Sequence, residues 1–193
     1  MARLREFDID DALDAAMQTF WLQGYEATSL VDLMAATGLQ KGSIYKAFKD
    51  KHSLFISALH RYFEAANDFH RQFLEQPESP KAGLTQWLRQ LVATYGNYDD
   101  GRGCFVVNSL VEMAPHDAEV KQLVANQIEY LRTLICRAIV SGQALGEFRD
   151  DIDAEDLSLL LLNLVHGIIV SAKGAIPKQK LQRQAELAIA LLA

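Results

Sequence analysis

The chain has 193 residues, half of them hydrophobic, and carries 19 Lys and Arg against 25 Asp and Glu for a formal net charge of −6. This length and composition are enough for a buried core in one globular domain or two small ones. The acidic balance argues against a protein that coats nucleic acid indiscriminately. No run of 18 or more apolar residues occurs, so we expect no membrane-spanning helix and no membrane partner.

The N-terminal residues, MARLREFDID, are polar and charged, which predicts no signal peptide and hence a cytoplasmic protein. In that compartment Cys104 and Cys136 are expected as reduced thiols rather than as a structural bridge. Arg3 and Arg5 precede the first expected helix, where they form either a flexible arm that reaches a DNA minor groove or a solvated tail.

Apolar residues recur at helical spacing along the whole chain, and no strand-like alternation or internal repeat appears. The sequence therefore predicts an all-α fold of about nine helices. Capping residues, glycines and prolines place them at about 9–23, 30–37, 41–48, 51–75, 81–95, 104–113, 117–142, 153–173 and 178–192. We expect the first three to form one domain over residues 1–50 and the other six to form a second over residues 51–193.

The stretch from Thr28 to Phe48, TSLVDLMAATGLQKGSIYKAF, is typical of two short helices joined by a tight turn. Ser29 and Asp32 have the spacing of a capping box, and Gly38 is free to adopt the positive φ that ends a helix. In the second helix Ile44 and the phenylalanine four residues later face inward, which leaves a polar outer face. Two helices arranged in this way form the motif that reads DNA grooves.

Four lysines and one aspartate fall between Lys41 and Lys51, a local charge of +3 in an acidic chain. A small cationic face of this kind fits a DNA reader that releases counterions over a short footprint. Without the surrounding motif, the same lysines would be read as a solvated helix face.

This stretch resembles the signature of TetR-type bacterial repressors, T-x-x-D-[IL]-A-x-x-A-G-[VL]-x-x-G-x-[IL]-Y-x-[YH]-F-x-x-K. The resemblance is strong over about residues 8–60 and is mostly a matter of helix count beyond them. Asp32 departs from the signature because it follows Thr28 by four residues rather than three. Ala47 also departs, since Tyr or His is commoner there and can contact phosphate. The matching positions are Thr28, Asp32, Leu33, Gly38, Lys41, Gly42, Ser43, Ile44, Tyr45, Phe48 and Lys51.

The resemblance implies a DNA-binding helix-turn-helix domain whose second motif helix enters a major groove by its N-terminal end. Gly42 would let the backbone approach the duplex closely, and Thr28 and Lys51 lie at helix N-termini suited to phosphate. The candidate DNA-contacting residues are Thr28, Gln40, Lys41, Gly42, Ser43, Tyr45, Lys46 and Lys51.

In TetR-type proteins the helices after the motif surround an inducer cavity, so the resemblance also implies a ligand site in the second domain. An apolar cavity with a few polar groups suits such a site. For each candidate taken singly, a place in the ordinary core is the alternative. The candidates are Trp87, Leu91, Tyr95, Cys104, Phe105, Asn108, Glu112, Leu131 and His166.

Cys104 opens an apolar helix directly after Gly101-Arg102-Gly103, where the helix N-terminus and Arg102 would favour the thiolate. The GCFVVN stretch resembles the segment of TetR-type regulators that sense electrophiles or oxidants through a cysteine. A buried, inert thiol is the alternative. Cys136 is expected to be inert.

The helix expected over 153–173 is apolar on two faces, so one face can meet the protein's own core while the other meets a partner. With the last helix it predicts two helices per subunit in a twofold dimer. A central core helix in a monomer is the alternative. The expected interface residues are Leu160, Leu164, Ile168, Leu181, Ala185 and Ile189.

Together these features predict a homodimeric transcriptional regulator. We expect it to be a repressor that leaves an inverted-repeat operator when an inducer binds the second domain. Its heads would enter successive major grooves, roughly 34 Å apart. The competing interpretation is a small helical enzyme or ligand carrier in which the motif only packs. The five histidines lack metal-ligand spacing, and no G-x-S-x-G, Walker or dinucleotide motif occurs, so we expect neither metal nor cofactor nor catalysis.

Overall fold

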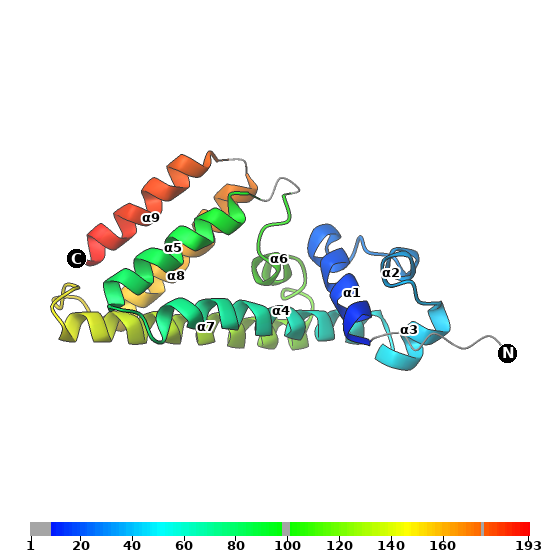
Figure 1. Cartoon of the computed structure of the whole chain (residues 1–193). Helices are drawn as coiled ribbons and strands as arrows, with labels where there is room; N and C mark the ends of the chain where they lie inside the picture. The colour runs from blue at the N-terminus through cyan, green and yellow to red at the C-terminus, as the bar shows by residue number, and fades with distance from the viewer. Residues whose placement is uncertain (1–8, 98–100, 175) are drawn as a thin grey trace.

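The computed structural model describes residues 9–97, 101–174 and 176–193, which form nine α-helices and no strand (Figure 1). The predictions of an all-α fold and of nine helices are confirmed. The helices are α1 (Ile9–Gln23), α2 (Leu30–Thr37), α3 (Lys41–Phe48), α4 (Lys51–Leu74), α5 (Pro80–Tyr95), α6 (Phe105–Glu112), α7 (Ala118–Ala144), α8 (Ala154–Lys173) and α9 (Lys178–Leu192).

The first three helices and the N-terminal turns of α4 pack into a small unit at one end of the molecule, which we call the head (Figure 1). Phe20 is fully buried, and its ring lies edge-on to Phe55 of α4 with 5.2 Å between ring centroids. Leu33 of α2 and Ile44 of α3 are buried beside them. Because each helix is short, its stability comes from burying this one apolar face.

The remaining helices form the body, in which α4 and α7 run lengthwise and α5, α8 and α9 cross them at the far end (Figure 1). Helix α6 lies between the head and these crossing helices. The buried side chains of head and body form one continuous cluster. Head and body therefore share one packed core.

Helix α8 is long and apolar enough, by length and composition alone, to cross a membrane. Its buried residues, which include Leu157, Leu161 and Val165, pack inside the body against α7, α9 and α5. A core helix of a soluble protein has the same composition, because it too is apolar on most sides.

Candidate functional site

The turn between α2 and α3 is built by the two local signals that the sequence predicts. The Ser29 backbone N–H donates to Asp32 Oδ2 at 2.8 Å, and the Asp32 backbone N–H donates to Ser29 Oγ at 3.2 Å, which completes a capping box. Gly38 has φ of 70°, and its N–H donates to the Met34 carbonyl to close α2.

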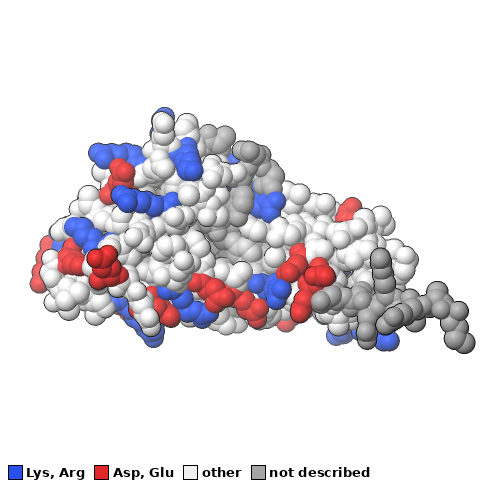
Figure 2. Space-filling view, viewed as in Figure 1, with Lys and Arg blue, Asp and Glu red and all other residues white. Residues whose placement is uncertain are grey.

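Helix α3 buries Ile44 and turns a polar face to solvent. Of the residues expected to contact DNA, Ser43 is half-buried on this face. No atom lies within 4 Å of a Cβ built on Gly42, so the backbone there is open to solvent. Figure 2 shows Lys and Arg atoms at the lower edge of the head, in the region of α3. The exposed members of the set are Gln40, Lys41, Gly42, Tyr45 and Lys46.

Two expected phosphate contacts have other roles in the head. Thr28 is fully buried, and its hydroxyl donates to the Gly24 carbonyl at 2.5 Å, so its side chain lies inside the head and not on the expected DNA face. Lys51 is half-buried, with Nζ 4.3 Å from the centroid of the Tyr25 ring. Arg3 and Arg5 lie outside the described residues.

A strained turn joins α3 to α4. Lys49 has φ of 72° and ψ of −56°, and the Asp50 N–H donates to the Phe48 carbonyl at 2.9 Å across it, which makes a γ-turn. Asp50 then caps α4, accepting the Ser53 N–H at 2.7 Å. A positive φ at a residue with a Cβ carries a conformational cost, so the packing around it must hold the turn in place.

The last residue of α6, Glu112, joins body to head. Its Oε2 accepts the Tyr25 N–H at 3.1 Å and its Oε1 accepts the Glu26 N–H at 2.9 Å. Two successive backbone N–H groups after a residue of positive φ, here Gly24, form a cradle for an anion. The expectation that Glu112 lines the ligand cavity is therefore wrong, because its carboxylate points at the α1–α2 turn.

Other polar contacts tie the same two parts together. Trp21 Nε1 donates to the Gly103 carbonyl at 2.9 Å, and Arg61 Nε donates to Asp14 Oδ1 at 2.8 Å. The Arg61 guanidinium lowers the pKa of the Asp14 carboxyl. Asn108 also faces this region and not the cavity: its Nδ2 donates to the Arg102 carbonyl at 2.7 Å.

A cavity of about 40 Å³ lies inside the body, where α4, α5, α7 and α8 meet the start of α6. Of the expected ligand residues, it is lined by Leu91, Tyr95, Cys104, Leu131 and His166. Two others lie elsewhere in the core. Trp87 is fully buried behind His70, and the Phe105 ring packs edge-on against Phe55 with 5.6 Å between centroids.

The expected set omits three polar residues of the cavity wall: Tyr62, His70 and Gln127. Tyr62 follows Leu59 by three residues and His70 follows Tyr62 by eight, so helical spacing continued beyond Leu59 is the signal that could have found them. Polar side chains that are buried within an apolar stripe need hydrogen-bond partners, so these two positions indicate a polar site inside the core.

Three polar contacts lie at this wall or directly behind it. The Tyr62 hydroxyl lies 3.2 Å from that of Tyr95 and 3.5 Å from Cys104 Sγ. Burial raises the pKa of the Tyr62 phenol well above its usual value, and the neighbouring Cys104 and Tyr95 raise it further. Trp87 Nε1 donates to His70 Nδ1 at 3.0 Å, and burial lowers the pKa of His70 to about 4.

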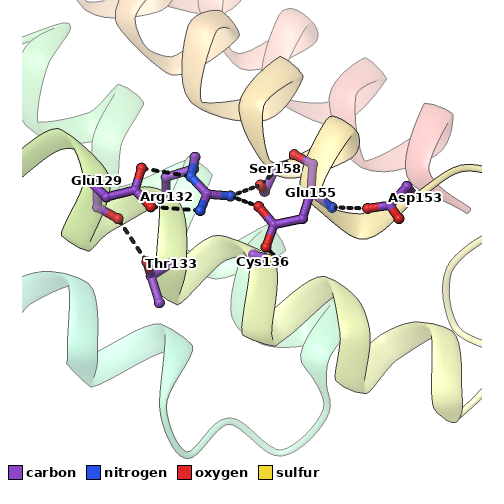
Figure 3. Close-up of polar contacts among 7 residues, drawn as sticks. All are labelled: Glu129, Arg132, Thr133, Cys136, Asp153, Glu155 and Ser158. Atoms are coloured by element: carbon purple, nitrogen blue, oxygen red, sulfur yellow. Dashed lines mark hydrogen bonds and ion pairs between the residues drawn. The ribbon is translucent and has the colours of Figure 1, made fainter.

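The second cysteine belongs to a polar cluster between α7 and α8 (Figure 3). Arg132 pairs with Glu129 and Glu155, and the Cys136 thiol lies 3.5 Å from Glu155 Oε1. Burial first, and then Glu155, raise the pKa of Cys136, which keeps the thiol protonated. This geometry accords with the inert role expected for Cys136.

The outer face of α8 and α9 differs from the expected dimer face. Leu160 is 64% exposed, and Leu164 is half-buried. The other four expected residues are buried within the chain, which leaves them little surface for a partner: Ile168, Leu181, Ala185 and Ile189. Helix α9 lies against α5 and α8 through these residues, so its other side is outward. The exposed apolar residues of the two helices are Leu159, Leu160, Val170, Leu187 and Leu191.

A head that presents a basic helix beyond a glycine turn, tied through α6 to a body with an internal cavity, has the architecture of a helix-turn-helix transcriptional regulator. Residues 12–58 match the family model for bacterial regulatory proteins of the tetR family. Residues 82–187 match that for the tetracyclin repressor-like C-terminal domain.

Whole-chain relatives agree with these matches. The chain is 30% identical to the HTH-type transcriptional repressor ComR of Escherichia coli (strain K12), across 94% of this chain and 87% of ComR. It is 28% identical to the uncharacterized HTH-type transcriptional regulator YezE of Bacillus subtilis (strain 168), across 100% of both chains.

Among solved structures, a cysteine-substituted variant of the TetR family transcriptional regulator CifR in complex with 26-base-pair operator DNA superposes with a TM-score of 0.88. The two chains are 30% identical, and the match covers 100% of each. This chain therefore belongs to the TetR family and is a DNA-binding transcriptional regulator. Members of this family are not enzymes, so the competing interpretation as a small helical enzyme is set aside.

Proposed function

We propose that this protein is a cytoplasmic repressor, which binds an inverted-repeat operator as a homodimer and leaves it when an inducer enters the body. The observation that carries the proposal is the outward face of α3, where Lys41 and Lys46 are exposed on a helix that the Gly38 turn projects from the head. The complex of the CifR variant with operator DNA supports the same use of the head.

Contact with DNA is assigned to the N-terminal half and outer face of α3. Gly42 offers open backbone to the groove, while Tyr45 and Lys46 supply a hydroxyl and a charge on the exposed side. Lys51 serves phosphate from its position over Tyr25. Thr28 contributes indirectly: its side chain lies inside the head, where the hydroxyl donates to the Gly24 carbonyl and helps to hold the turn before α2. The remaining proposed contacts are Gln40, Lys41 and Ser43.

Dimerisation is assigned to the outer faces of α8 and α9. One short recognition helix covers too few base pairs for useful specificity, so two heads are required. Leu159, Leu160 and Val170 on α8 and Leu187 and Leu191 on α9 are the exposed apolar side chains that a second copy would cover. In this proposal residues 51–193 are the dimerisation and ligand-binding domain and residues 1–50 are the DNA-binding domain.

The inducer site is assigned to the cavity bordered by Cys104 and His166. Reversible occupation of this cavity is the version we propose, because Cys104 is buried and near the Tyr62 hydroxyl, where it completes a hydrogen-bonded wall. The inducer would favour the conformation whose heads are wrongly spaced, and a preference of a few kcal/mol for it suffices. Cys104→Ser then keeps its response to the inducer; loss of the response with an intact fold would support covalent sensing.

Genome-wide capture of bound DNA, followed by gel-shift titration of the captured sites at several salt concentrations, tests the proposal. We expect saturable binding to an inverted repeat. In Lys46→Ala affinity falls and the slope of log K against log salt decreases by about 2, because the homodimer loses one phosphate contact from each of its two heads. Lys121→Ala, an exposed lysine on α7, is the matched control and leaves the slope unchanged. Equal behaviour of the two variants would contradict the assignment of α3.

A further inference from the structure

The cavity in the body presents no formal charge to a ligand. None of the described residues that line it is Lys, Arg, Asp or Glu. Burial lowers the pKa of His70 to about 4 and also lowers that of His166, so both rings are neutral near pH 7. A charged ligand would leave water and find no opposite charge there, which is costly.

One hydrogen-bond donor of the wall has a defined orientation. The indole N–H of Trp87 can only donate, and it donates to His70 Nδ1 at 3.0 Å. Nδ1 is therefore unprotonated, and the neutral ring carries its proton on Nε2. Because Trp87 occupies the Nδ1 side, the donor that remains on this ring is Nε2–H, and the ring lines the cavity. Such a donor matches an oxygen acceptor and does not match a second donor.

The rest of the wall suits an apolar body. Leu91, Leu131 and Val165 project from three helices toward the same space. Gln127 is already engaged in two amide hydrogen bonds with Asn67, at 2.6 and 3.4 Å. The ligand surface away from its oxygen therefore meets mainly aliphatic side chains, whose burial supplies the affinity.

The cavity is small, and its outer wall is shared with a groove on the surface. Its 40 Å³ is well below the roughly 150 Å³ of an apolar cavity that binds benzene. A groove of about 290 Å³ at the surface is lined by five of the same residues, Tyr62, Ala66, His70, Leu91 and Tyr95. A ligand gains room when this wall opens and the two spaces merge.

Tyr95 is the movable part of that wall. Tyr62 is buried, with its ring edge-on to Trp21 at 5.0 Å and to Phe105 at 5.7 Å between centroids. Tyr95 is half-buried at the end of α5, and its hydroxyl meets that of Tyr62 at 3.2 Å. Rotation of Tyr95 would break its contact with the Tyr62 hydroxyl, whereas rotation of Tyr62 would also break the ring contact with Trp21 of the head.

We propose that the cavity takes an uncharged molecule of about the size of benzene, with an apolar body and one carbonyl- or ether-type oxygen, which enters past Tyr95 and accepts the His70 Nε2–H. The inference rests on the proposed function only in naming this molecule as the inducer. Its chemistry follows from the wall itself.

Four probes that share a saturated six-membered carbon ring test the chemistry on the full-length protein: cyclohexanone, methylcyclohexane, cyclohexanecarboxylate and cyclohexylammonium. Binding is followed without DNA by ligand-detected NMR, with tryptophan fluorescence as a second signal. We expect cyclohexanone to bind about tenfold more tightly than the hydrocarbon, which lacks the acceptor, and at least about 100-fold more tightly than either ion. Binding of either ion at comparable affinity, or no binding by cyclohexanone, would overturn the proposal.

Two variants locate the site. His70→Phe is expected to abolish the preference for cyclohexanone over methylcyclohexane, while His60→Phe, at an exposed position on the same helix, keeps it. The comparison of probes on the unaltered protein remains decisive if His70→Phe does not fold. A preference retained in folded His70→Phe would overturn the role of this donor.

Operator release is scored separately, in gel shifts with the same four probes. Tight cyclohexanone binding without release would contradict the proposed induction and leave the ligand chemistry standing. Release by an ionic probe that binds the protein directly would support induction and overturn the ligand chemistry.

Discussion

Gly24 and Glu112 are in such close contact that a Cβ built on the glycine would lie 2.8 Å from Oε2 and 2.9 Å from Oε1 of the glutamate. Gly24 also has φ of 86°, which L side chains rarely adopt. The carboxylate of a body helix is thus seated on the head only because this residue is a glycine. The α1–α2 turn is held by α6, the helix that begins beside Cys104 at the cavity.

Gly24→Ala is expected to lower the free energy of unfolding by about 1–2 kcal/mol through the positive φ alone, and also to lower operator affinity because Glu112 is pushed off the turn. Gly146→Ala is the matched control: φ there is 69° and nothing lies within 4 Å of the added Cβ. The residue belongs to the segment between α7 and α8, which lies at the end of the molecule away from the head (Figure 1). Urea unfolding and gel shifts check both variants. Equal operator affinity in the two would show that the contact does not position the head.

The turn at Lys49 gives a second prediction. Lys49→Gly removes the cost of a positive φ at a residue with a Cβ and is expected to raise the free energy of unfolding by up to about 1 kcal/mol. The operator affinity of this variant should fall, because the freer backbone of glycine no longer fixes the orientation of α3 relative to α4. Lys49→Gln separates the loss of charge from the change of backbone, since it keeps the strain. A Gly variant no more stable than the Gln variant in urea unfolding would refute the strained turn.

The head was predictable because its signals are local. Ser29, Asp32 and Gly38 act on their own helix, so the capping box and the turn follow from residues within a few positions of one another. The contact of Glu112 with the turn after α1 joins residues 86 and 87 positions apart. No periodicity signals such a contact. A lysine at the γ-turn was equally hidden, because the residue expected for a positive φ is glycine.

The sequence predicts where the helices of the body lie along the chain, but it does not predict which face of each helix is buried. Helix α8 is apolar on two sides, so spacing alone could not say which side faces α5, α7 and α9. The spacing therefore predicts Ile168 at the interface, although it is buried in the chain, and does not predict Leu159, which is exposed. The cavity was found in part for the same reason: which polar residues line it depends on how five segments converge.

The buried His70 makes stability depend on pH. An unfolded histidine has a pKa near 6.5, and burial lowers the folded value to about 4. Between these values the unfolded chain binds the proton and the folded chain does not, so stability falls as pH falls from about 6.5 toward 4. The loss amounts to about 2 kcal/mol at pH 5.

Urea unfolding at pH 7 and pH 5, with the free energy extrapolated to zero urea, measures this loss. His70→Gln should remove most of it, because the amide does not titrate, although the variant is less stable at pH 7 if it spoils the contact with Trp87. His116→Gln, at an exposed site, keeps the full dependence. If the His70 and His116 variants lose the same stability between the two pH values, the loss has another origin.

The outer face of α8 gives a prediction on assembly. Leu160→Glu places a carboxylate where a second copy would bury it unpaired, so we expect the dimer Kd to rise by at least about 100-fold and operator affinity to fall with it. Leu145→Glu is the matched control, since that side chain is 68% exposed against 64% for Leu160 and lies beyond the end of α7.

Sedimentation velocity across a concentration series separates the outcomes. A monomeric, folded Leu160→Glu beside a dimeric Leu145→Glu supports the α8 face. Leu181→Glu should instead lower the free energy of unfolding, because Leu181 is fully buried inside one chain. A dimer that persists in Leu160→Glu with unchanged Kd would place the interface on another surface and leave the exposed leucines of α8 without a partner.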